Sequence, residues 1–246
     1  MKIRTIFSLS VFLFCVCNVW AQTNIPGVFS TGVDNSGNVL APGQTDPHYT
    51  ISASPIGAVP ALTSTLSPTW VTNTPSSAWI NATGNGTDIE PAGFYAYVLL
   101  FSMNGLDPST AQITGLWASD NASEIYFNGV DTGISNYPDE FSALDPFSIT
   151  NGFVAGQNQL LFYVTQDPTV SSENPEGLQV DIISATAQPV PEPAAVSLLG
   201  LSGLLLAGRF LKNKRSTGCG ASNLSGPEQP ASLVAPEPDE GGRPLG

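Results

Sequence analysis

The side chains that could carry out chemistry are mostly carboxylates. Between residues 22 and 190 the chain has one histidine, His48, and no cysteine. A zinc site needs several nitrogen or sulfur ligands, and a Ser-His-Asp triad needs a base with its own orienting partner. A pairing of His48 with Asp46 would be the nearest equivalent, and it is more simply interpreted as a capped turn before a strand. The sequence therefore argues against both kinds of site.

Glycoside hydrolysis needs only two facing carboxylic acids. The candidate pairs are Asp139 with Glu140 and Asp120 with Glu124. Asp139 and Glu140 are adjacent in a loop that contains proline, and adjacent side chains of an extended segment point to opposite faces. A polysaccharide hydrolase is therefore the least favoured interpretation, and we expect a protein that is not an enzyme.

Oxygen ligands for calcium gather at two turns. Asp34 and Asn38 lie at the ends of a short loop around Gly37, and Asp120 and Asn121 lie between two expected strands. Calcium prefers such ligands, but aspartate and asparagine are also common turn residues because their side chains cap the backbone. We expect no cofactor, with calcium as the alternative.

The charge of this stretch has one sign. All seven lysines and arginines lie outside residues 22–190, whereas fifteen acids lie inside, which gives the stretch a formal charge of −15. Such a surface repels phosphate polyanions, so nucleic-acid binding is excluded. The acids are Asp34, Asp46, Asp88, Glu90, Asp107, Asp120, Glu124, Asp131, Asp139, Glu140, Asp145, Asp167, Glu173, Glu176 and Asp181.

Aromatic side chains could bind sugars by stacking on the apolar faces of the rings. Trp70 and Trp79 lie in segments rich in Thr, Ser and Pro and are the candidates for an exposed platform. Burial in the core is the general expectation for tryptophan. Trp117 lies within an expected strand, where a core position is favoured.

The elements that must position these residues are short strands. Apolar runs alternate with turn residues every 8 to 15 positions, which is typical of an antiparallel sandwich. The run 94–101 is almost wholly apolar and predicts a central strand buried on both faces, and Asn128-Gly129 predicts a tight hairpin turn. The predicted strands are 48–53, 78–80, 94–103, 111–118, 123–127, 147–150, 159–166 and 177–185.

Both ends of the chain look like targeting segments. Lys2 and Arg4 precede an apolar run over residues 6–16, and cleavage between Ala21 and Gln22 would remove a secretory signal peptide. Near the other end, the tripeptide Pro191-Glu192-Pro193 precedes an apolar run over residues 194–208, which is marginally long enough to cross a bilayer if Arg209 snorkels. A basic cluster follows, made of Arg209, Lys212, Lys214 and Arg215.

The order of tripeptide, apolar run and basic cluster resembles the PEP-CTERM sorting signal, which exosortases recognise. Within the body, Trp117-Ala118-Ser119-Asp120-Asn121 and the following strand with its Asn128-Gly129 turn resemble the galactose-binding-domain-like jelly rolls. These resemblances imply an all-β antiparallel jelly-roll sandwich flanked by a signal peptide and a transmembrane sorting helix. The expected boundaries are 1–21 for the signal peptide, 22–187 for the sandwich, 188–215 for the sorting signal and 216–246 for a disordered tail.

The expected function follows from these segments. The chain is predicted to be an exported cell-surface or extracellular-matrix protein, with exosortase as a partner and a membrane-anchored precursor. The alternative is a carbohydrate-binding module for exopolysaccharide.

Overall fold

The computed structural model describes residues 21–137, 141–168 and 174–191. Every regular element in these ranges is a strand, and all pairings between the strands are antiparallel. The strands are β1 (Thr23–Asn24), β2 (Thr45–Ala53), β3 (Val59–Thr63), β4 (Ile80–Asn81), β5 (Gly93–Ser102), β6 (Leu106–Asp120), β7 (Ser123–Phe127), β8 (Val130–Ser135), β9 (Asp145–Ile149), β10 (Gln157–Gln166) and β11 (Gly177–Pro189).

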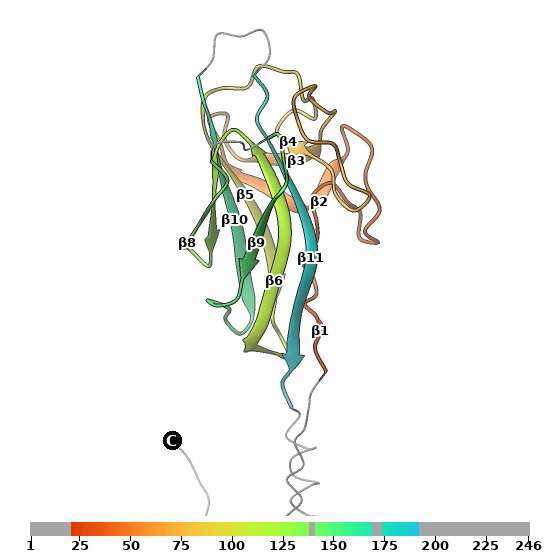
Figure 1. Cartoon of the computed structure of the whole chain (residues 1–246), viewed down its shortest axis with the longest axis vertical. Helices are drawn as coiled ribbons and strands as arrows, with labels where there is room; N and C mark the ends of the chain where they lie inside the picture. The colour runs from red at the N-terminus through yellow and green to blue at the C-terminus, as the bar shows by residue number, and fades with distance from the viewer. Residues whose placement is uncertain (1–20, 138–140, 169–173, 192–246) are drawn as a thin grey trace, which may run out of the picture. The chain divides into compact units, whose positions relative to one another are not determined.

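The strands follow the order β8-β7-β10-β5-β2-β3-β4-β11-β6-β9, and β1 pairs with β11 beside this path. The sheet rolls over, so that β5 and β10 form one layer and β6 and β11 the other (Figure 1). Contacts between the layers confirm the roll, since Trp117 of β6 packs against Phe162 of β10 with their ring centroids 5.5 Å apart. The predicted all-β antiparallel sandwich is confirmed.

The core lies between the two layers. Leu160, Phe162 and Val164 of β10 are fully buried, while the residues between them are partly exposed, as the two-residue period of a strand requires. Trp117 is also fully buried and belongs to the same core cluster. Its predicted core position is confirmed.

The central position of β5 is confirmed, because this strand pairs with β10 on one side and with β2 on the other. Burial on both of its faces is only partly confirmed. Phe94 and Leu100 point to the outer face and are 52% and 51% exposed. The described residues therefore leave part of this outer face uncovered.

The Asn128-Gly129 hairpin turn is confirmed. It connects β7 to β8, and both residues have positive φ, 49° and 78°, as the favoured two-residue turn requires. The Asn128 side chain also ties the turn to β10, because its Oδ1 accepts a hydrogen bond from the Gln159 amide at 2.8 Å.

All the strands and both core clusters found in the described residues lie between Gln22 and Pro191, so this stretch carries the described fold. We refer to residues 22–191 as the sandwich domain. No helix in the described ranges is long and apolar enough to cross a membrane. Residues 1–20 of the predicted signal peptide, the apolar run, the basic cluster and the tail lie outside the described residues, as do Glu192 and Pro193 of the tripeptide.

Candidate functional site

Trp70 and Trp79 do not form an exposed platform. Trp70 is 4% exposed and Trp79 is fully buried. Their rings stack on each other with centroids 4.1 Å apart, and Gly177 packs so closely that a Cβ there would lie 2.7 Å from the Trp70 ring. Both indole N–H groups are used internally: Trp70 donates to Asp120 Oδ2 at 2.7 Å and Trp79 to the Val71 carbonyl at 2.8 Å. The expectation of core burial is the correct one for this pair.

The Asp34 loop has the geometry of a capped turn. Asp34 Oδ1 accepts hydrogen bonds from the backbone amides of Ser36 and Asn38, at 2.8 and 2.9 Å, and Oδ2 accepts one from Asn38 Nδ2 at 3.0 Å. These hydrogen bonds, led by that of the Asn38 side chain, lower the pKa of Asp34. These N–H groups occupy the side of the carboxylate on which a cation would have to bind. The role of Asp34 and Asn38 is therefore to cap the turn.

The second calcium candidate is also engaged in internal contacts. Asp120 is 7% exposed and holds the indole of Trp70, while Asn121 Oδ1 accepts a hydrogen bond from the Asp167 amide at 3.0 Å. In the described ranges no group of three or more His, Cys, Asp or Glu side chains is arranged to hold a metal ion.

Of the two carboxylate pairs considered for hydrolysis, the pair within the described residues, Asp120 and Glu124, does not face a common site. Asp120 faces the interior, whereas Glu124 is exposed and its Oε2 accepts a hydrogen bond from the Tyr126 hydroxyl at 3.1 Å. Asp139 and Glu140 lie outside the described residues. Asp46 accepts hydrogen bonds from the backbone amides of His48 and Tyr49, and the His48 ring stacks on Phe29 at 3.7 Å. The predicted capping by Asp46 is confirmed, but its place before a strand is wrong, because Asp46 and His48 both lie within β2, Thr45–Ala53.

Nothing in the sequence indicated that two of the fifteen acids, Glu90 and Glu176, are buried. Glu176 is fully buried and Glu90 is 3% exposed. Glu176 accepts hydrogen bonds from the Ala82 amide and the Tyr97 hydroxyl, and Glu90 Oε2 accepts one from the Glu176 amide at 2.7 Å. Burial raises the pKa of Glu90 to about 7 and that of Glu176 well above its usual value. Because they are enclosed, these carboxyl groups act on the fold and cannot reach an external substrate.

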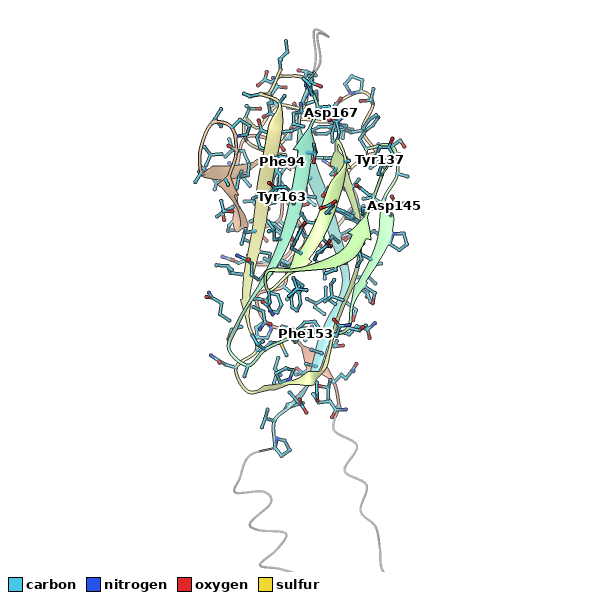
Figure 2. The ribbon with its side chains drawn as sticks, turned by 90° about the vertical axis from the view of Figure 1, so that its left-hand side faces the viewer. Phe94, Tyr137, Asp145, Phe153, Tyr163 and Asp167 are labelled. Carbon is cyan, nitrogen blue, oxygen red and sulfur yellow. The ribbon has the colours of Figure 1, made fainter. Side chains whose placement is uncertain are left out.

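A row of three exposed or half-exposed aromatic rings crosses the outer face of the sheet. Phe94 of β5 stacks on Tyr163 of β10 with centroids 4.9 Å apart and planes 18° from parallel. Tyr126 of β7 meets Tyr163 edge-on at 6.2 Å. Figure 2 shows Phe94 and Tyr163 on neighbouring strands. We call Phe94, Tyr163 and Tyr126 the aromatic strip.

The register of the strands explains why these rings meet. Tyr163 lies opposite Ala96 of β5 and opposite Glu124 of β7, and Phe94 lies two residues along β5 from Ala96. Large side chains reach such diagonal neighbours, and the small Ala96 leaves room between the two rings. The sequence shows Phe94 two residues before Ala96, but it does not show that β5 pairs with β10, and this pairing is what brings Phe94 to Tyr163.

Carboxylates border the strip. Glu124 is the direct cross-strand partner of Tyr163, and Asp131 of β8 is the partner of Tyr126. Both acids are exposed. The hydrogen bond to Glu124 and the nearby negative charges, Asp131 among them, raise the pKa of Tyr126. The face thus combines apolar rings with negative charge, and no lysine or arginine occurs anywhere in residues 22–191.

No protein-family model matches the sequence, and no curated protein matches it. Among solved structures, the chain is similar to CBM35 from Paenibacillus barcinonensis. The match covers 56% of this chain and 94% of that chain, with 16% sequence identity and a TM-score of 0.31.

Proposed function

We propose that the sandwich domain is a non-enzymatic module that binds polysaccharide across the aromatic strip. The observation that supports the proposal is the exposure of Phe94, which is stacked on Tyr163 at 4.9 Å and still leaves 52% of its surface to solvent. Covering an exposed aromatic face with the apolar face of a sugar ring removes both surfaces from water and so lowers the free energy of the complex. The rings are held by strands and by one another, so little conformational entropy is lost when a ligand binds.

Replacing Tyr163 by alanine is expected to weaken polysaccharide binding about tenfold, because this ring contacts both of the others and a tenfold loss corresponds to ~1.4 kcal/mol. The measurement is calorimetric titration or affinity electrophoresis of the sandwich domain with soluble neutral, cationic and anionic glycans. Ile183→Ala is the matched control, because Ile183 is an apolar residue of β11 that is 65% exposed and lies away from the strip. Absence of binding to all three glycan classes would reject the proposal.

We also propose that the chain is exported and sorted to the cell surface or matrix through an exosortase. The support is the sequence of the two ends: the basic and apolar start with cleavage between Ala21 and Gln22, and the Pro191-Glu192-Pro193 signal. Export would bring the strip into contact with extracellular polymers, exopolysaccharide among them.

Changing Pro191 and Pro193 together to alanine is expected to leave the precursor in the membrane, because the extended segment in front of the apolar run would then be free to continue as helix. Cell fractionation and immunoblotting of the wild type and the double variant give the measurement. A double variant with Thr217 and Ser222 changed to alanine, beyond the basic cluster, is the control. Processing of the proline variant at the wild-type rate would contradict the sorting proposal.

A further inference from the structure

We infer, resting on the polysaccharide binding proposed above, that the aromatic strip selects polysaccharides carrying protonated amino sugars. The inference comes from the two carboxylates that border the strip. Glu124 lies directly opposite Tyr163, and Asp131 lies directly opposite Tyr126. Direct cross-strand partners have Cβ atoms about 5 Å apart. Each tyrosine ring is therefore accompanied by a negative charge on the same face of the sheet.

A sugar ring stacked on Tyr163 would bring its substituents within reach of Glu124. An ammonium substituent is attracted both by the carboxylate and by the negative face of the aromatic ring, and both attractions strengthen binding. A carboxylate substituent, as in a uronic acid, is repelled by Glu124 and Asp131, and residues 22–191 contain no lysine or arginine that could offset this repulsion. A sugar with only neutral substituents is bound by the stacking contact alone.

Local charge matters more than the net charge of the domain under ordinary salt conditions. The Debye length at 0.15 M salt is ~8 Å, so most of the acids of the domain are screened from a ligand on the strip. Glu124 and Asp131 lie within that distance of the tyrosines. The position of these two acids, rather than the total of fifteen, is what gives the selectivity.

The test compares two oligosaccharides of the same length and linkage, the fully deacetylated and the fully N-acetylated hexamers of β-1,4-glucosamine, at a mildly acidic pH that keeps the amines protonated. The sandwich domain is titrated with each at ~0.15 M salt. We expect the deacetylated hexamer to bind five- to tenfold more tightly, by the usual size of cation–π and surface charge contributions. The preference should shrink as the salt concentration rises.

Glu124→Gln tests the position of the charge, because glutamine keeps the shape and an acceptor for the Tyr126 hydroxyl. We expect the ratio of the two affinities to be clearly smaller in this variant than in the wild type, while Asp131, beside Tyr126, retains part of the preference. Asp145→Asn is the matched control, since it removes one negative charge from β9, which belongs to the other layer. This control should keep the preference.

The outcomes separate the inference from the proposed function. Equal affinity for the two hexamers, or tighter binding of a polyuronate, overturns the inference and leaves polysaccharide binding in place. Equal loss of preference in Glu124→Gln and Asp145→Asn also overturns it, because attraction would then arise from net charge. Failure to bind any glycan rejects both.

Discussion

Raising the pH from about 5 to about 8 is expected to lower the free energy of unfolding of the sandwich domain by at least about 3 kcal/mol, the contribution of Glu90 alone. The cause is the buried pair of Glu90 and Glu176. Glu176 is fully buried, Glu90 is 3% exposed, and residues 22–191 contain no lysine or arginine. Two carboxylates that share an enclosed site cannot both ionise at low cost.

The direction follows from the pKa of Glu90, which rises from 4.5 to about 7 on folding because of burial, with Asp88 and Asp120 adding repulsion. Below about pH 4.5 the group is protonated in both the folded and the unfolded chain, so the stabilisation is fully present. Between about 4.5 and 7 the unfolded chain releases the proton while the folded chain retains it, and stability falls. Above about 7 the loss is complete. The pKa of Glu176 is also raised, by burial first and then by the charge of Glu90, so this group adds to the loss in the same direction.

Glu176→Gln is expected to reduce this pH dependence by about half or more, because it removes one of the two charges and keeps an oxygen for the Ala82 amide, which donates at 3.0 Å. The variant should exceed the wild type in stability at about pH 8 and differ by less than about 1 kcal/mol at about pH 5. Urea unfolding followed by tryptophan fluorescence at several pH values is the measurement. Asp145→Asn removes a charge outside the core and should keep the wild-type dependence; a parallel reduction in both variants would assign the effect to general repulsion.

Strand positions were predictable where the local pattern decides them. The bounds of β7 were predicted to the residue, and β5 and β10 to within two residues, because their apolar residues are contiguous or alternate and turn residues flank them. β3 was missed because Pro60 suggests a break, and β8 because Asp131, Thr132 and Gly133 suggest a turn. Their pairing with β2, β4 and β7 outweighs those local preferences.

The candidate site was not predictable in the same way, because it depends on pairings between distant segments. The apolar run 94–101 indicated burial on both faces of the strand. The strip is exposed because none of the described residues covers Phe94 on the outer face. The composition around Trp70 suggested exposure, but Asp120, fifty residues away, holds its indole in the interior. Glu90 and Glu176 gave no signal, since glutamate is rarely buried and nothing nearby marks these two as exceptions.

Replacing Trp79 by alanine is expected to lower the free energy of unfolding by about 3–5 kcal/mol, the usual cost of removing a buried tryptophan. The change would remove the stacking partner of Trp70 and the hydrogen bond to the Val71 carbonyl, and it would leave a cavity beside Gly177. Phe94→Ala should cost less than about 1 kcal/mol, because half of that side chain is already in water. Denaturant unfolding of the two variants beside the wild type gives the comparison.

Binding measurements on these two variants and on a third, Trp79→Phe, separate the fold from the site. Phe94→Ala should remain folded and lose polysaccharide affinity, whereas Trp79→Phe, which keeps an aromatic ring in the core, should retain both fold and affinity. A Trp79→Ala protein that unfolds like the wild type but no longer binds polysaccharide would contradict this assignment, because the indole would then have to contact the ligand. With no exposed surface on Trp79, such contact would require the segments around Trp70 and Trp79 to open first. The exposed strip needs no such opening, and for this reason its rings are the better candidates for a polysaccharide surface.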